Sequence, residues 1–244
     1  MTTRPKIVII GMGRLGRSVA QALEEAGWVV IGCGRGDRPP KAPITWLTVP
    51  DTSLAEVVTT VPTGGVILHA SGAMDLSVLR PRSPIGSLHP LMTFPGPEVS
   101  MPEMSGLPAA MSGDPLALQA AKEIIGALGW SGFVITGDRA LYHSAAVMAG
   151  NYATTLLCVA ADILAAAGVQ RSTAPDLLIP LAMQSIRNAA SDNVETVLTG
   201  PIVRRDEAII TAHQAALSQL DPENLELYNT MLSVTRTLLK KKKN

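Results

Sequence analysis

A glycine-rich turn near the start of the chain restricts its fold more than any other feature. The apolar run KIVII, residues 6–10, has the length of a buried strand, and GMGRLG, residues 11–16, follows it directly. A helical stretch extends from about Arg14 to Ala26, and a second short apolar run, WVVIGC, comes after it. A G-x-G-x-x-G sequence between a strand and a helix is typical of a dinucleotide-binding turn, whereas the same glycines elsewhere would indicate only a plain turn.

Each glycine of this turn has its own physical reason. Gly11 permits the tight turn, Gly13 lets the backbone approach a pyrophosphate, and Gly16 lets the helix pack closely on the sheet. The N-terminus of the helix attracts the anion. The predicted cofactor contacts in the turn are Gly11, Met12, Gly13, Arg14, Leu15 and Gly16.

Strand-like runs and helices alternate through the first half of the chain. The runs ITWLTV, VILHA, IGSLH, LPAAM and GFVIT each have strand length. The clearest helix between them, DPLALQAAKEIIGALG, has Asp114 as a candidate cap and Gly129 at its end. This alternation predicts a Rossmann-type parallel sheet with helices on both faces.

Strand signals disappear after about Gly137. The remaining sequence reads as several helices, with breaks near Gly168, Pro175, Pro201 and Pro222. The predicted fold class is therefore α/β: a Rossmann-like nucleotide-binding domain over residues 1–137, followed by an all-α domain over residues 138–244.

Composition indicates the class of protein and the cellular compartment, and it argues against some kinds of partner. The 244 residues are 47% hydrophobic and 16% charged, as expected for a well-packed globular protein. The formal net charge of zero argues against nucleic acid as a partner, and no uninterrupted apolar run has the roughly 18 residues of a membrane span. Cys33 and Cys158 give no disulfide framework, which favours a reducing cytoplasm.

The end of the second predicted strand selects the cofactor. An NAD site usually has Asp or Glu there, whereas this chain has Cys33 and Gly34, followed by Arg35 and Arg38. A guanidinium suits a ribose phosphate, so the sequence favours NADP(H) over NAD, with Arg35 as the predicted contact. Asp37 leaves the other cofactor open, because a loop shift would bring its carboxylate to the ribose. Both arginines would alternatively be solvated loop residues.

Two further strand ends are expected to face the cofactor, because ligands of open parallel sheets lie beyond the carboxyl ends of the strands. TVPDTS, residues 48–53, contributes Val49 and Pro50, although Ser53 and Glu56 would also form a helix capping box. HASG, residues 69–72, has small residues that let a nicotinamide lie close. Its predicted contacts are His69, Ala70 and Ser71.

The motif GSLHPLMTFP, residues 86–95, provides a candidate catalytic residue. Pro90 forces His89 toward an extended conformation at a strand end. An imidazole titrates near neutral pH and can handle a proton there. The alternative is a hydrogen-bonded structural histidine.

Together, several motifs in a fixed order give a resemblance over nearly the whole chain. They are GMGRLG, TVPD, HASGA, GSLHPLMTF, YHSAAVMAGNY, IPL and LTGPIVRRD. With them the chain resembles the Rossmann-like NADP oxidoreductases that carry a C-terminal helical domain of unknown function. These are relatives of pyrroline-5-carboxylate reductase, ketopantoate reductase and the deazaflavin-dependent NADP oxidoreductases. The resemblance implies a nicotinamide-binding domain and a helical domain that commonly dimerises and closes the substrate cleft. The HP dipeptide is also similar to that of prephenate dehydrogenases.

The stretch YHSAAVMAGNY, residues 142–152, places His143 and Asn151 on one expected helix edge, with Val147 between them. In the related hydroxyacid dehydrogenases and ketopantoate reductases, a catalytic lysine stands four residues before the asparagine, where this chain has Val147. No lysine occurs between Lys122 and Lys240. His143 is therefore the first candidate proton donor, His89 the second, and Asn151 is expected to orient the substrate. The alternative is that His143 and Asn151 are buried polar residues that tie helices together.

The segment GPIVRRDEAIITAH, residues 200–213, supplies a candidate anion site. Arg204 and Asp206 are expected in the first turn of one helix after Pro201. Arg204 would bind a substrate carboxylate with Asp206 holding its guanidinium, or the two would form a purely structural pair. The spacing of His, Cys and acidic residues matches no metal site.

These features predict an NADPH-dependent reductase of a small carboxylate-bearing oxo or imino compound. The resemblance alone suggests a ketopantoate-like 2-oxo acid as the first guess for the substrate. Hydride transfer is expected at the cleft between the domains of a homodimer. The alternatives are a non-catalytic NADP-binding sensor or interaction protein, and a prephenate-type dehydrogenase.

Overall fold

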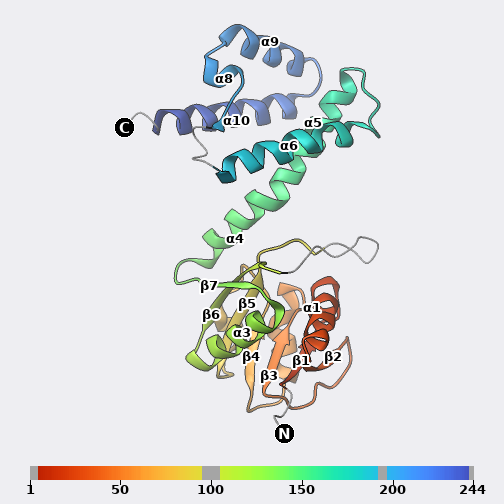
Figure 1. Ribbon diagram of the computed structural model, residues 1–244, viewed down its shortest axis with the longest axis vertical. Helices are drawn as coiled ribbons and strands as arrows, with labels where there is room; N and C mark the ends of the chain where they lie inside the picture. Colours follow the sequence, from red (N-terminus) through yellow and green to blue (C-terminus); the bar gives the residue numbers. More distant parts are fainter. Residues whose placement is uncertain (1–4, 95–104, 192–196, 242–244) are drawn as a thin grey trace. The chain divides into compact units, whose positions relative to one another are not determined.

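The computed structural model describes residues 5–94, 105–191 and 197–241 (Figure 1). Contacts divide the chain into two compact units, Met1–Gly150 and Asn151–Asn244. The expected domain boundary lies after Gly137. The division by contacts falls later, so that helix α4 (Arg139–Val147) belongs to the first unit.

A seven-stranded sheet forms the centre of the first unit. Its strands are β1 (Lys6–Ile10), β2 (Val29–Cys33), β3 (Ile44–Leu47), β4 (Val66–His69), β5 (Ile85–Pro90), β6 (Pro108–Gly113) and β7 (Ser131–Val134). They lie in the order β2-β1-β3-β4-β5-β6-β7. All seven apolar runs thus form strands, and the predicted α/β fold is confirmed.

The sheet is parallel from β2 to β5, but β6 pairs with β5 in the antiparallel direction. The prediction of a parallel sheet was therefore wrong at this one junction. Pro90 at the end of β5 lies opposite Ala109 near the start of β6, so the chain turns back at the same edge of the sheet. A strand that returns from the edge at which its neighbour ends must run antiparallel. Strand β7 is parallel to β6.

Helices cover both faces of the sheet. Helices α1 (Arg14–Glu25) and α3 (Pro115–Leu128) pack on one face, against side chains such as Trp46 and Leu68. Helix α2 (Leu54–Thr60) packs on the other, against Leu47 and Ile67. Each of these fully buried side chains contributes roughly 1.5–3 kcal/mol of transfer free energy. Burial on both faces explains why β1, β3 and β4 read as continuous apolar runs without alternation.

Two expected helix caps do not form. Asp114 precedes α3, but its carboxylate accepts a hydrogen bond from the backbone N–H of Ile85 at 2.9 Å and thereby ties the helix start to β5. Ser53 precedes α2 and makes no side-chain capping bond, so the predicted capping box with Glu56 was wrong. Gly129 ends α3 in the left-handed region at φ 66°, as predicted.

The described residues of the second unit form helices joined by turns and short loops. Its helices are α5 (Ala153–Ala166), α6 (Ala174–Ser191), α8 (Pro201–Arg204), α9 (Glu207–Ser218) and α10 (Pro222–Lys241). Helix α9 lies against α10 (Figure 1), where Tyr228 and His213 are joined at 3.0 Å and Gln214 donates to Asn229 at 2.7 Å.

Helix α6 presents large apolar side chains to solvent. Leu177, Leu181 and Ile186 keep 60%, 65% and 59% of their surface exposed. Clustered exposed apolar side chains mark association surfaces. The expected homodimer agrees with this surface and stays a prediction.

One described stretch, Arg139–Ala166, is long and apolar enough to cross a membrane by length and composition, with a mean hydropathy of 1.4. The same criterion is met by helices of soluble proteins. The expectation that membranes are no partner stays a prediction.

The close packing of α1 on the sheet gives a test of stability. A Cβ at Gly16 would overlap the carbonyl oxygen of Gly11, which is backbone and cannot move aside. We expect Gly16→Ala to lower the free energy of unfolding of the first unit by about 1–3 kcal/mol. The measurement is urea unfolding of the full chain followed by tryptophan fluorescence, since Trp28, Trp46 and Trp130 all lie in this unit.

Gly126→Ala is the matched control. Gly126 lies within α3, and a Cβ there would meet nothing within 4 Å. We expect this change to stabilise the unit by about 0.5–1 kcal/mol, as for a glycine in a helix interior. Equal effects of the two substitutions would contradict the packing argument.

Candidate cofactor and catalytic site

The glycine turn after β1 is held by close backbone contacts. Gly11 has φ 106°, and a Cβ on it would lie 2.8 Å from the carbonyl oxygen of Thr48. The hydroxyl of Thr48 donates to the carbonyl oxygen of Gly11 at 2.7 Å, which fixes the turn to the end of β3. Gly13 has nothing within 4 Å of the position of a Cβ, so its backbone is open to a ligand.

A cleft of about 950 Å³ opens beside this turn. Five predicted cofactor residues line it: Gly11, Met12, Arg35, Val49 and Pro50. The remaining predicted residues of the turn, Gly13, Arg14, Leu15 and Gly16, lie outside this lining. Ser53 and Glu56 also line the cleft, at the position where the sequence left a cofactor contact open.

The loop after β2 contributes two arginines and one aspartate to the lining of the cleft. Arg35, Asp37 and Arg38 all line it. The carboxylate of Asp37 accepts a hydrogen bond from the backbone N–H of Gly34 at 2.7 Å. Asp37 therefore closes its own loop in this structure, whereas the arginines are exposed.

Three of the four histidines gather at the carboxyl ends of β4 and β5. The ring centroids of His89 and His143 are 6.3 Å apart. Gly72, after β4, lies against both rings, because a Cβ on it would be 2.9 Å from Nε2 of His89 and 2.7 Å from Cδ2 of His143. The fold thus brings together the motifs HASG, HP and YH, while His213 lies in the second unit.

His69 supports this site from within. Its side chain is fully buried, and its Nδ1 accepts a hydrogen bond from the backbone N–H of Ser71 at 3.2 Å. The hydroxyl of Ser71 accepts from the N–H of Met74 at 2.9 Å. His69, Ala70 and Ser71 are not among the residues that line the cleft, and their predicted cofactor contacts stay predictions.

Tyr142 was missed by sequence reasoning, although it adjoins His143. Its hydroxyl lies 2.7 Å from Nδ1 of His89, and the two rings meet edge to face. Asp138 caps the start of α4, because its carboxylate accepts from the N–H groups of Ala140 and Leu141. The signal that could have found Tyr142 was its place on a helix already predicted to enter the site.

Arg139 was missed as well. Its Nη1 donates to the hydroxyls of Ser87 at 2.9 Å and Ser112 at 3.0 Å, and its Nη2 donates to the carbonyl of Ser71 at 2.5 Å. Within the described residues, no carboxylate lies within ion-pair distance of this half-buried guanidinium. An arginine in the first turn of a helix usually reads as a solvated residue, so the local sequence gave no sign of this role.

Burial and charge together lower the pKa values of His69 and His89. Burial, followed by the charge of Arg139, lowers the pKa of His69 to about 4. Burial, followed by His143 and Arg139, lowers the pKa of His89 to about 4. Burial raises the pKa of Tyr142 above its ordinary value, while Arg139 acts in the opposite direction.

The residues predicted in the helical domain are not joined as expected. Helix α8 ends at Arg204, Arg205 has φ 56°, and Asp206 caps α9 by accepting from the N–H of Ile209 at 3.2 Å. The placement of Arg204 and Asp206 in one first turn was therefore wrong, because the chain breaks between them. No ion pair joins the two among the described residues. Their substrate contacts stay predictions.

Asn151 needs a similar correction. Residues Met148–Tyr152 form a π turn rather than a continued α-helix. The four-residue spacing on which a shared edge with His143 depended is interrupted there, because a π turn has a longer period. Asn151 also begins the second unit, and its role stays a prediction.

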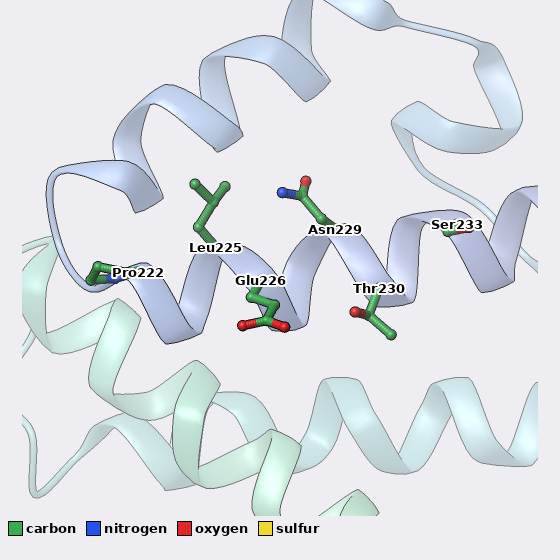
Figure 2. A pocket seen from close by; sticks show the side chains of 6 residues that line it. All are labelled: Pro222, Leu225, Glu226, Asn229, Thr230 and Ser233. Carbon is green, nitrogen blue, oxygen red and sulfur yellow. The ribbon is translucent and has the colours of Figure 1, made fainter.

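A second hollow, of about 460 Å³, lies along one face of α10 and contains no predicted site residue (Figure 2). Its lining comprises Pro222, Leu225, Glu226, Asn229, Thr230 and Ser233. Among the described residues, no group of three or more His, Cys, Asp or Glu side chains is placed to hold a metal ion.

The buried histidines predict a loss of stability in acid. The unfolded chain binds protons at His69 near the usual pKa of 6.5, whereas the folded chain binds them only near 4. The contribution of neutral His69 to the free energy of unfolding is therefore fully present above pH 6.5. It is lost as the pH falls toward 4, by roughly 3 kcal/mol. His69→Asn keeps an acceptor for Ser71 and should remove this part of the decline, as measured by urea unfolding at several pH values. His213→Asn, at an exposed histidine, should leave the decline intact; the same decline in His69→Asn would contradict the assignment.

Comparisons with known proteins agree with this architecture. Residues 107–235 match the family model described as "Domain of unknown function (DUF2520)". The putative NADP oxidoreductase BF3122 from Bacteroides fragilis is 22% identical, with a TM-score of 0.80 over 96% of this chain and 98% of that one. Protein TM1727 from Thermotoga maritima is 22% identical, with a TM-score of 0.78 over 98% and 100%.

A reductive aminase from Aspergillus terreus, in complex with NADPH and ethyl-5-oxohexanoate, is 18% identical, with a TM-score of 0.65 over 98% of this chain and 99% of that one. At these identities the likeness shows the fold. A search of curated proteins found no match. Because the family model covers more than half of the chain, the protein belongs to the DUF2520 family, and its fold is the Rossmann-like fold of these oxidoreductase structures.

Proposed function

We propose that the protein is an NADPH-dependent oxidoreductase that reduces a small carboxylate-bearing oxo or imino compound. The observation that carries this proposal is the position of the His89–Tyr142–His143 group. It lies at the ends of β4 and β5, at the same edge of the sheet as the glycine turn and within the same unit. Ligands of such sheets bind at this edge.

The cofactor is held by the turn, the helix and the loop after β2. Helix α1 begins at Gly13 without a side-chain cap and without an acidic residue in its first turn. Its first N–H groups are therefore available to a pyrophosphate. Arg35 and Arg38, on the wall of the cleft, suit the additional phosphate of NADPH. The reductive aminase of the same fold was solved with NADPH, which supports this choice.

The charges of the site favour an anionic substrate. Arg139 is half-buried without a carboxylate partner among the described residues, and His69 and His89 are neutral at pH 7. A substrate carboxylate near this cation, which forms no ion pair among the described residues, is stabilised. NADPH supplies the hydride, and His89 or His143 handles the proton. Asn151 orients the substrate and Arg204 contacts its carboxylate in this proposal. In the same proposal, the protein forms a homodimer through its second unit.

Cofactor choice can be tested at Arg35. We expect Arg35→Ser to weaken NADPH binding about 10- to 100-fold, since a hydrogen bond between charged groups contributes about 1.5–3 kcal/mol. NADH lacks the phosphate, so its affinity should change little. Both affinities are measured by calorimetry, with Arg187→Ser, on the exposed surface of α6, as the control. An equal loss of affinity for both cofactors would argue against phosphate recognition by Arg35.

Turnover is tested by NADPH consumption with ketopantoate, 1-pyrroline-5-carboxylate and other small 2-oxo acids. We expect one of them to be reduced, and we expect His143→Ala or His89→Ala to lower kcat by about 10²- to 10⁴-fold, the usual contribution of acid–base catalysis. His213→Ala, in the second unit, is the matched control. Tight NADPH binding without consumption of any compound would instead support a non-catalytic NADP-binding sensor.

A further inference from the structure

We propose that His89 gives the proton of its Nε2 to the substrate while Tyr142 donates its own proton to Nδ1 of His89, and that Arg139 supplies the counter-charge to the tyrosinate. This inference rests on the proposed reductase function. It assigns roles to two residues, Tyr142 and Arg139, that the sequence did not single out.

The direction of the hydrogen bond between Tyr142 and His89 follows from the chemistry of the two groups. A neutral imidazole has one nitrogen that donates and one that accepts. The hydroxyl of Tyr142 lies 2.7 Å from Nδ1 of His89. A phenol is a strong donor and a weak acceptor, because its oxygen lone pair is shared with the ring. The hydroxyl therefore donates to Nδ1, which leaves the proton of His89 on Nε2.

The proton on Nε2 of His89 must be accessible to the substrate. Nε2 of His89 faces Gly72, and none of the described residues forms a hydrogen bond with this atom. A side chain at Gly72 would cover Nε2 and collide with His143. Nε2 has no hydrogen-bond partner and is not one of the buried unpartnered side-chain atoms of the described residues, so it is accessible at the carboxyl edge of the sheet, where the substrate of such a fold binds.

Arg139 brings a positive charge to the site. Three hydrogen bonds to Ser87, Ser112 and Ser71 hold its guanidinium in place. Because no carboxylate within the described residues pairs with it, its charge is left to act on the neighbouring site. Arg139 and Tyr142 lie three residues apart on α4, which makes them neighbours on the helix surface, so the guanidinium stabilises the anionic form of Tyr142 that burial disfavours.

The reaction balances with these groups. Hydride passes from NADPH to the carbonyl carbon, and the electron pair of the C=O bond moves to the oxygen. That oxygen takes the proton of Nε2, while Nδ1 takes the proton of Tyr142 and a tyrosinate forms near Arg139. A solvent proton then enters at Nε2, and the Nδ1 proton returns to Tyr142. His89 never carries two protons, in agreement with its low pKa of about 4.

The tautomer of His89 gives a test that needs no substrate. Nitrogen NMR of the full chain with labelled histidines distinguishes the two neutral tautomers, and only four histidines contribute signals. The signal of His89 is assigned from its loss in His89→Gln. We expect the Nε2–H form at every pH well above 4, and a mixture of forms in Tyr142→Phe. An Nδ1–H form in the unaltered protein would overturn the proposal, because Tyr142 would then accept rather than donate.

Kinetics tests the transfer itself, with whichever panel compound consumes NADPH. We expect Tyr142→Phe to lower kcat about 100-fold, with little change in KM or in NADPH affinity. Arg139→Lys should retain more of kcat than Arg139→Gln, since the lysine keeps the charge.

Tyr228→Phe is the matched control, because it removes a hydroxyl from the other Tyr–His pair, Tyr228 and His213 on α10 and α9. An unchanged kcat in Tyr142→Phe would overturn the relay while leaving the reductase intact. If no compound is reduced, the proposed function fails, and the tautomer still decides whether Tyr142 and His89 have the geometry of a relay.

Discussion

The guanidinium of Arg139 is the interaction on which the candidate site depends. It joins the first turn of α4 to three neighbouring strands, through Ser71 after β4, Ser87 in β5 and Ser112 in β6. No other contact described for α4 reaches all three. These bonds tie the start of α4 to the carboxyl edge of the sheet. Tyr142 and His143, one turn further along, then face the end of β5.

This bridge also sets the charge of the site. Burying a cation costs several kcal/mol unless hydrogen bonds or an opposite charge compensate it. Here the compensation comes from two hydroxyls and a carbonyl, which are dipoles and leave the net charge in place. The same charge helps to keep His69 and His89 neutral. A carboxylate in place of Ser112 would neutralise the site and remove its preference for an anion.

The sequence predicted the parts that depend on local pattern. All seven strands could be placed, β1, β3 and β4 because residues buried on both faces form continuous apolar runs and the others as short apolar runs between helices or loops. The glycine turn could be placed because its conformation needs Gly11. The antiparallel direction of β6 could not be predicted, since an apolar run such as LPAAM does not indicate the direction in which the strand pairs. His89 and His143 were found through motifs. Arg139 and Tyr142 were not, because their partners lie 27 to 68 residues away along the chain.

Gly72 shows how a residue without chemistry of its own can fix a chemical site. Its backbone is not in the left-handed region, so conformation does not require a glycine there. Close approach does, because the rings of His89 and His143 come from β5 and α4 and both lie where a Cβ would stand. A larger residue would separate the two rings or displace α4. Either change would distort the hydrogen bond between Tyr142 and His89. The small residues of HASG are therefore needed for the histidines as much as for any nicotinamide beside them.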